Sequence, residues 1–354
     1  MANLFFKTNI HIFNHTKLLF ACKYSQLHVP VMLNEVIDSL KPSKNQTFID
    51  MTFGAGGHSK KLLESAENVK IIALDRDPFA YNIAQDLSKE YPNQVVPLLG
   101  RFSDLPELLK QHKIRQNSID GILFDFGCSS MQFDSADRGF SVSKNGPLDM
   151  RMDGLSDSPS AADVLAYMDE EDIAKILKVY GEEKHAKKIA RAIVEARYSF
   201  KKLQTTEELA MLVDSVCTEE HRVDKLQRFS HSATKTFQAL RIFVNNEINE
   251  INYGIVVAQK YLKIGGRLVA ISFHSLEDVI VKRHILGNVI DNAINPLPLK
   301  YSDHTLCHDK EIIDSIMESP WRSLNKQIIT PSYKEIESNP RSRSAKLRAA
   351  VRVS

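Results

Sequence analysis

The chain has 354 residues, a length typical of two domains or of one large domain that carries an insertion. Hydrophobic residues make up 43% and charged residues 25%, with 14 glycines and 13 prolines, and these values exclude disordered, collagen-like and low-complexity proteins. The net charge of +2 argues against an overwhelmingly basic surface. The four cysteines lie far apart, without a Cys-x-x-Cys pair, which disfavours a disulfide framework and a zinc ribbon.

Residues 1–27 have the composition of a mitochondrial targeting segment. Lys7, Lys17 and Lys23 precede the first acidic residue of the chain, Glu35. Because the segment lacks arginine, a flexible extension of chance composition is the alternative. We therefore expect the mitochondrial matrix as the location, with the cytoplasm as the alternative. No run of about 18 consecutive apolar residues occurs, so we expect no membrane partner.

Apolar, β-rich runs alternate with helix-compatible segments in the first part of the chain. The runs cover residues 47–51, 69–74, 95–99 and 119–124. This alternation predicts an α/β fold with a mostly parallel sheet. Two residues predict the start of one helix: Asp77 can cap its N-terminus, and Pro78 suits its first position.

The pattern changes near residue 139, where helical periodicity continues without strands until about residue 232. Strand character returns at residues 267–273, followed by a helix over 276–284 and a last strand over 347–353. Residues 287–341 show little periodicity and several prolines, so we expect a long irregular connection there. We therefore predict one catalytic domain, 28–138 with 233–354, interrupted by an all-helical insertion, 139–232.

A glycine-rich turn follows the first predicted strand, in the sequence TFGAGGHS (52–59). Asp75 ends the next strand, 21 residues beyond Gly54. Glycines allow a ligand to approach the backbone, and an acid at this spacing can accept hydrogen bonds from ribose hydroxyls. Ser59 occupies the position of the third glycine in dinucleotide sites, which favours S-adenosylmethionine over a nicotinamide dinucleotide. A turn that needs glycine only for its backbone angles is the alternative.

Three further residues are candidates for the chemistry. Asp125 ends the fourth predicted strand, at the sheet edge where α/β proteins bind ligands, and its alternative role is to cap the following turn. Asp149 and His274 belong to segments that can reach the same edge. His58 and His274 are each either a general base or a residue that orients a loop. The run HTLCH (304–308) lacks a second cluster at zinc spacing, so we expect no metal.

Seven motifs together resemble the RsmH/MraW family of S-adenosylmethionine-dependent methyltransferases, which modify the exocyclic amine of a cytidine in small-subunit rRNA. The motifs are DMTFGAGGHS (50–59), LDRDP (74–78), DFGCSSMQ (125–132), GPLDMRMD (146–153), YGEE (180–183), TFQALR (236–241) and SFHSLED (272–278). The resemblance runs from HVPVMLNE (28–35) to NPRSRS (339–344), and Phe126 and Met131 depart mildly from the bacterial pattern. The N-terminal segment resembles the mitochondrial branch of the family, which implies mitochondrial small-subunit rRNA or the ribosomal subunit as partner.

The resemblance also implies a Rossmann-like class I methyltransferase domain, a helical insertion that faces RNA, and a set of cofactor contacts. These contacts are Gly56, Gly57, His58, Asp75, Phe102, Asp125 and Gln132. Methyl transfer to a delocalised amine depends mainly on positioning, together with an oxygen acceptor for an amino hydrogen. Asp125 or a backbone carbonyl beside it is the first candidate for that acceptor, and Asp149 and His274 are weaker ones. The oligomeric state stays open, with a homodimer as one option.

The near-neutral total charge conceals regional differences. Residues 148–183 contain 10 acidic and 3 basic residues, whereas residues 184–202 contain 7 basic residues and one acidic residue. Candidate RNA-binding residues are Lys184, Lys187, Lys188, Arg191 and Arg241. A solvated helix face is the alternative for any single basic run. A non-catalytic RNA-binding assembly factor and a nicotinamide dehydrogenase are the competing functions, and the cofactor motifs favour the methyltransferase.

Overall fold

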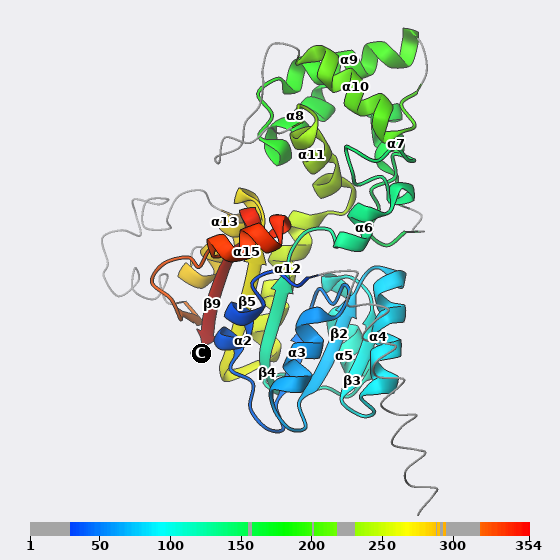
Figure 1. Ribbon diagram of the computed structural model, residues 1–354. Helices are drawn as coiled ribbons and strands as arrows, with labels where there is room; N and C mark the ends of the chain where they lie inside the picture. Colours follow the sequence, from blue (N-terminus) through cyan, green and yellow to red (C-terminus); the bar gives the residue numbers. More distant parts are fainter. Residues whose placement is uncertain are drawn as a thin grey trace, which may run out of the picture. The chain divides into compact units, whose positions relative to one another are not determined.

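The computed structural model describes residues 29–154, 158–199, 202–217, 231–287, 289–290, 293–294 and 319–354. These residues form two compact units (Figure 1), of which the first combines the chain before Cys128 with the chain from Glu250 onward, and the second covers 128–249. The predicted targeting segment and the HTLCH run lie outside the described residues. No helix in the described ranges is long and apolar enough to cross a membrane.

The first unit contains a seven-stranded sheet in the order β3-β2-β1-β4-β5-β9-β8. Strands β1 to β5 pair in parallel, β9 runs antiparallel to β5, and β8 runs antiparallel to β9. The strands are β1 (Thr47–Asp50), β2 (Lys70–Asp75), β3 (Val95–Leu99), β4 (Ile119–Asp125), β5 (Leu262–Ser272), β8 (Trp321–Ser323) and β9 (Lys346–Arg352). The predicted α/β fold with a mostly parallel sheet is confirmed.

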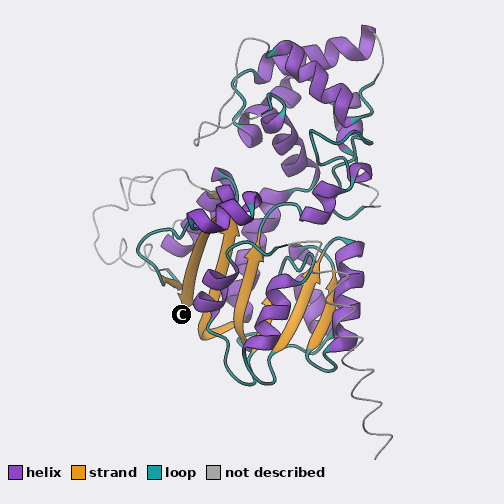
Figure 2. Ribbon diagram, viewed as in Figure 1, coloured by secondary structure: helices purple, strands orange, loops and turns teal. Residues whose placement is uncertain are grey.

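Helices cover the sheet (Figure 2). They are α2 (Leu33–Leu40), α3 (Gly57–Ser65), α4 (Pro78–Glu90), α5 (Leu105–Gln111), α12 (Glu247–Tyr261), α13 (Ser275–Leu286) and α15 (Tyr333–Ser338), with the 3₁₀ turns η1 (Phe102–Asp104) and η4 (Pro340–Ser344). The predicted cap of α4 is confirmed, because the Asp77 carboxylate accepts a hydrogen bond from the Phe79 amide and Pro78 follows it. Phe48, Ile122 and Phe124 are buried in the core beneath these helices.

The prediction of a long irregular connection over 287–341 is wrong in its described part. That part contains the strands β6 (Val289–Ile290) and β7 (Ala293–Ile294), which pair with each other. It also contains the edge strand β8, helix α15 and the turn η4. Each of these elements has two to six residues. Elements this short do not complete enough periods for a hydrophobic pattern to emerge, so their positions depend on pairing with β9 and on packing.

The second unit is helical. It contains α6 (Ser130–Asp134), η2 (Ala136–Arg138), α7 (Ala161–Tyr167), α8 (Glu170–Gly181), α9 (Ala186–Ser199), α10 (Thr206–Val216) and α11 (Thr234–Val244). Ser129, Ser160 and Thr205 begin α6, α7 and α10 with side-chain caps. Ile189 and Ile193, which lie one turn apart on α9, are both buried.

The boundaries of the helical unit differ from the predicted insertion, 139–232. Phe237 and Leu240 of α11 belong to the same buried cluster as Ile173 and Leu177 of α8. The helical unit consequently extends to residue 249, and at its other end it begins at Cys128. Because α11 packs on α8, sequence periodicity alone could not show to which unit this helix belongs.

Candidate cofactor and methyl-transfer site

The glycine-rich turn leads from β1 into α3 and has a backbone that only glycine adopts easily. Gly54 and Gly56 have φ angles of 55° and 77°. A Cβ atom on Gly56 would lie 2.5 Å from the Phe53 ring, so a side chain at this position has no room. The turn therefore presents bare backbone at the carboxyl edge of the sheet, as a bound nucleoside requires.

Asp75 ends β2 and is held by two backbone amides. Its Oδ2 accepts a hydrogen bond from Gly54 N at 2.7 Å and its Oδ1 accepts one from Asp77 N at 2.9 Å. Burial raises the pKa of Asp75 to about 6, although these two hydrogen bonds oppose the rise. Asp75 thus connects the turn to α4 and holds its carboxyl group in one orientation, as expected for a ribose acceptor.

Asp50 is a site residue that the sequence analysis did not single out. It ends β1, is 2% exposed, and its Oδ2 accepts a hydrogen bond from Ser59 Oγ at 2.7 Å. Its Oδ1 accepts a weaker one from Thr52 N at 3.2 Å. Burial raises the pKa of Asp50 to about 6. Ser59, which stands where dinucleotide sites have their third glycine, therefore forms a hydrogen bond to the end of β1. The position of Ser59 directly after the glycine turn was the sequence signal for this contact.

Asp125 ends β4 between β1 and β5, where its amide donates a hydrogen bond to Thr52 Oγ1 at 2.7 Å. Its carboxyl atom Oδ1 is buried and has no hydrogen-bond partner among the described residues. Burial, and then the nearby Asp50 and Glu277, raise the pKa of Asp125 well above its ordinary value. A buried polar atom without a hydrogen-bond partner lowers the stability of a folded protein. Such an atom is therefore typical of a group that forms its hydrogen bond with a ligand.

His274 precedes α13, and its ring lies against Glu277. The Nε2 atom of His274 is 2.9 Å from Oε1 of Glu277. The buried Glu277 carboxylate also accepts hydrogen bonds through Oε2 from the Phe273 amide at 2.7 Å and the His274 amide at 3.3 Å. Glu277 therefore orders the β5–α13 turn, which favours an orienting role for His274 over that of a general base.

His58 is buried in the first turn of α3, where its Nε2 lies 3.0 Å from the carbonyl oxygen of Val31. Since a carbonyl oxygen only accepts, the proton of the ring must be on Nε2. Phe102 packs edge-on against Phe124, with ring centroids 5.4 Å apart, and lies 6.5 Å from the Phe126 ring. His58 thus orients a neighbouring segment, and Phe102 belongs to an aromatic group that can form an apolar wall for adenine.

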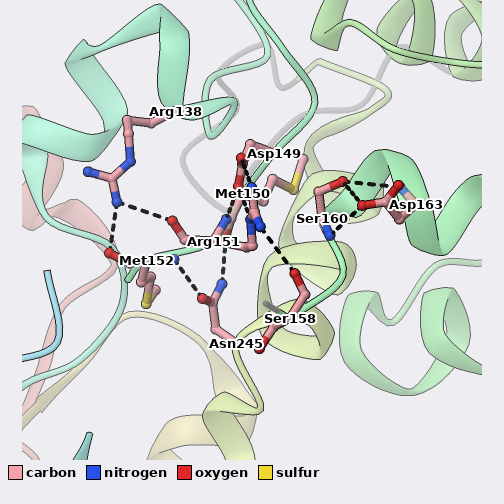
Figure 3. A network of polar contacts seen from close by, with 9 residues as sticks. All are labelled: Arg138, Asp149, Met150, Arg151, Met152, Ser158, Ser160, Asp163 and Asn245. Atoms are coloured by element: carbon pink, nitrogen blue, oxygen red, sulfur yellow. Dashed lines mark hydrogen bonds and ion pairs between the residues drawn. The ribbon is translucent and has the colours of Figure 1, made fainter. Parts of the chain in front are cut away.

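Gln132 and Asp149 belong to the helical unit. Gln132 is buried, accepts a hydrogen bond from Ser129 N, and donates one to the Met152 carbonyl. Asp149 forms a bidentate ion pair with Arg151, at 2.8 and 2.7 Å (Figure 3). Asn245 bonds both Met150 and Met152 in this network. Because the Asp149 carboxylate already pairs with a guanidinium, its geometry favours an ordering role over that of a proton acceptor.

The basic candidates of the helical unit fall into two groups. Lys184, Lys187 and Lys188 are exposed, and Arg191 is 72% exposed beside Glu195 on the same helix. Arg241, in contrast, is 15% exposed and forms a bidentate pair with Glu247, at 2.8 and 3.0 Å. The largely buried ion pair disfavours the predicted role of Arg241 as an RNA contact, because its guanidinium is already engaged.

Comparison with known proteins decides the family. The model of the MraW methylase family matches residues 25–353. The chain belongs to the MraW methylase family. It is 49% identical to mouse 12S rRNA N(4)-cytidine methyltransferase METTL15, over 93% of this chain and 83% of the mouse protein. It is 44% identical to ribosomal RNA small subunit methyltransferase H of Parvibaculum lavamentivorans, over 92% and 89% of the two chains.

A third relative, from Culex quinquefasciatus, is 64% identical over 92% of this chain and is named a receptor-type tyrosine-protein phosphatase. The chain spans 22% of that protein's length, so the name describes a much longer protein. Family membership confirms the predicted methyltransferase class, with S-adenosylmethionine as the cofactor. As a MraW methylase, the protein has a site that fits this cofactor: a glycine-rich turn, the acid Asp75, and a buried Asp125 atom with no hydrogen-bond partner among the described residues.

Proposed function

We propose that the protein transfers a methyl group from S-adenosylmethionine to the exocyclic amine of a cytidine in mitochondrial small-subunit rRNA. The observation that carries this proposal is Asp125, whose Oδ1 is buried without a hydrogen-bond partner among the described residues at the carboxyl end of β4. The rRNA cytidine named for the mouse relative agrees with the substrate that the motifs imply. A bound amine would complete the hydrogen bonding of Asp125.

In this proposal the carboxyl edge of the sheet holds the cofactor. Gly56, Gly57 and His58 contribute the turn, Asp75 accepts from the ribose hydroxyls, and Phe102 forms the apolar wall. Asp125 and Gln132 are the remaining proposed contacts. S-adenosylmethionine supplies a methyl group that is already activated on a sulfonium sulfur. The chain's own residues need only orient the two reactants and exclude water.

Asp125 has a second proposed role, toward the target amine. The lone pair of a cytosine amine is delocalised into the ring, which makes the nitrogen a weak nucleophile. A hydrogen bond from the amine to Asp125 Oδ1, or to a backbone carbonyl beside it, stabilises the positive charge that develops on the nitrogen. A nearby cation favours the charged carboxylate, so a bound sulfonium would offset the effect of burial on the Asp125 pKa.

The decisive experiment is nucleoside mass spectrometry of small-subunit rRNA from mitochondria with and without the protein. We expect N4-methylcytidine to disappear at one position without the protein and to return when the wild-type chain is restored. Unchanged N4-methylcytidine would contradict the proposed substrate. Calorimetry with S-adenosylmethionine separates the competing function, since a non-catalytic assembly factor would show no cofactor binding.

We also propose that the exposed basic residues at the start of α9 contact rRNA phosphates. The double variant Lys187→Glu/Lys188→Glu should weaken RNA binding about tenfold at physiological salt. The slope of log affinity against log salt concentration should fall by the amount expected for the loss of about two phosphate contacts. The matched control is Lys175→Glu/Lys178→Glu, which makes the same charge change on the exposed, acidic face of α8. Equal RNA affinities for the two double variants would refute this placement, and cofactor affinity should not change in either.

The proposed location is the mitochondrial matrix, on the basis of the basic, acid-free composition of residues 1–27. We expect these residues, fused to a reporter protein, to direct it into isolated mitochondria in a manner that depends on the membrane potential. A fusion with Lys7, Lys17 and Lys23 changed to glutamate is the control and should remain outside. Import of both fusions, or of neither, would contradict this proposal.

A further inference from the structure

A short segment at the start of the described chain, residues 29–32, links the cofactor turn to the C-terminal part of the fold. We call this segment the strap. On one side, Asn339 Nδ2 donates a hydrogen bond to the Val29 carbonyl at 3.1 Å, and Met32 N donates one to Glu335 Oε1 at 2.6 Å. Glu335 belongs to α15 and Asn339 immediately follows it, more than 300 residues from the strap in sequence. The proposed reaction assigns no role to the motifs that contain the strap and Asn339, which are HVPVMLNE (28–35) and NPRSRS (339–344).

The other side of the strap contacts the cofactor turn. The Val31 carbonyl accepts the hydrogen bond from His58 Nε2 at 3.0 Å. A Cβ atom on Gly57 would lie 2.7 Å from Pro30 Cγ, so the strap packs directly on the backbone where α3 begins. Val31 and Met32 are buried. The two residues that end the turn, Gly57 and His58, are therefore both held by the strap.

The strap needs an external support, because its own backbone is strained. Met32 has a φ angle of 52°, a left-handed conformation that side chains disfavour. Met32 precedes α2 and its side chain does not cap that helix. The Glu335 carboxylate bonds the Met32 amide at this helix N-terminus, where a negative charge is favourable. Glu335 itself lies within α15, where Asn339 N donates the last helical hydrogen bond to its carbonyl at 2.7 Å.

We infer that Glu335 and Asn339 are positioning residues for S-adenosylmethionine, acting through the strap on Gly57 and His58. The inference rests on the proposed cofactor role of the turn. Glu335 and Asn339 form hydrogen bonds to the strap, and the strap in turn bonds His58 of the turn. The C-terminal NPRSRS motif would thereby contribute to cofactor binding, although it lies outside the parallel strands that form the binding edge.

The test uses the full chain with Glu335→Ala, Glu335→Gln and, as a matched control, Glu337→Ala on the exposed side of the same helix. Glu335→Ala should raise the KM and the Kd for S-adenosylmethionine about tenfold, while kcat and RNA affinity stay within twofold of wild type. Glu335→Gln keeps an oxygen acceptor for the Met32 amide and should restore most of the cofactor affinity. Glu337→Ala should match wild type in every measurement.

Hydrogen exchange on the wild-type protein gives a second measurement that does not depend on a variant. S-adenosylmethionine should slow amide exchange in the strap and in residues 333–344 together with the turn. A lower Tm for Glu335→Ala with an unchanged cofactor KM would assign Glu335 a structural role only and overturn the inference. Absence of cofactor binding by the wild type would instead contradict the proposed function, so the two failures are distinguishable.

Discussion

Replacing Asp125 with asparagine should stabilise the folded protein at pH 7 while it lowers methyl transfer about 100- to 1,000-fold. The loss of rate is the size expected when one group that stabilises developing charge is removed. The gain in stability follows because Asp125 is buried near Asp50 and Glu277, and its Oδ1 has no partner among the described residues. A gain of about 1 kcal/mol in the free energy of unfolding corresponds to about 2–4 °C in Tm for a domain of this size.

The sign of the pH dependence makes this prediction specific. The pKa of Asp125 is raised in the folded protein. Its contribution to the free energy of unfolding is therefore fully present at pH values below the pKa of an aspartate in the unfolded chain, about 4. That contribution is lost as the pH rises through the folded pKa, because the unfolded chain then releases the proton more readily. Asparagine does not titrate. The difference in Tm between Asp125→Asn and wild type should therefore be small near pH 4 and increase toward neutral pH.

Thermal unfolding from pH 4 to 8 and single-turnover methyl transfer are the two measurements. Asp120→Asn is the control, since Asp120 lies near the other end of β4 and bonds Thr47 N and Lys263. This control should lose stability or stay unchanged, with methyl transfer near wild type. A variant Asp125→Asn that is less stable than wild type at pH 7, or one that retains full activity, would refute the assigned role.

Replacing Asp75 with asparagine should lower the affinity for S-adenosylmethionine about 100-fold at pH 7.5. Asp75 accepts hydrogen bonds from both Gly54 N and Asp77 N, whereas an asparagine has one acceptor oxygen and a donating amide. One of these contacts must therefore break, and the turn shifts. Hydrogen bonds to a charged group contribute about 1.5–3 kcal/mol each, and about 1.4 kcal/mol corresponds to a tenfold change in affinity.

Cofactor affinity and stability should follow opposite pH trends at Asp75. Its pKa is about 6, so the stability that it contributes is present below about pH 4 and is lost as the pH rises through 6. Cofactor affinity instead requires the charged acceptor and should fall as the pH drops through 6. Calorimetry between pH 5 and 8 measures the cofactor affinity of wild type, of Asp75→Asn and of the control Asp86→Asn, whose half-exposed carboxylate pairs with Lys89 on α4. A pH-independent wild-type affinity would show that Asp75 does not accept from the ligand.

The amino-acid pattern predicted much of the fold because parallel strands and capped helices leave local signals. The apolar runs that became β1, β2 and β4 are largely buried on both faces, so they are continuous in the sequence. Asp77 and Pro78 began α4 as expected, since capping involves neighbouring residues only. Strand β8 and helix α15 were missed because their stability comes from β9 and from the strap, not from their own periodicity.

The sequence by itself determined the family, through its motifs. It also determined the glycine turn and the acids Asp75 and Asp125, because the spacing of these residues along the chain is typical of a nucleoside site. Only the tertiary structure decided which charged residues already have partners. Arg151 engages Asp149 and Glu247 engages Arg241, while Asp125 Oδ1 has no hydrogen-bond partner among the described residues. The tertiary structure also revealed the strap, whose partners Glu335 and Asn339 lie more than 300 residues away in the sequence. Ion pairs and hydrogen bonds depend on distance in space, and long-range folding alone establishes that distance.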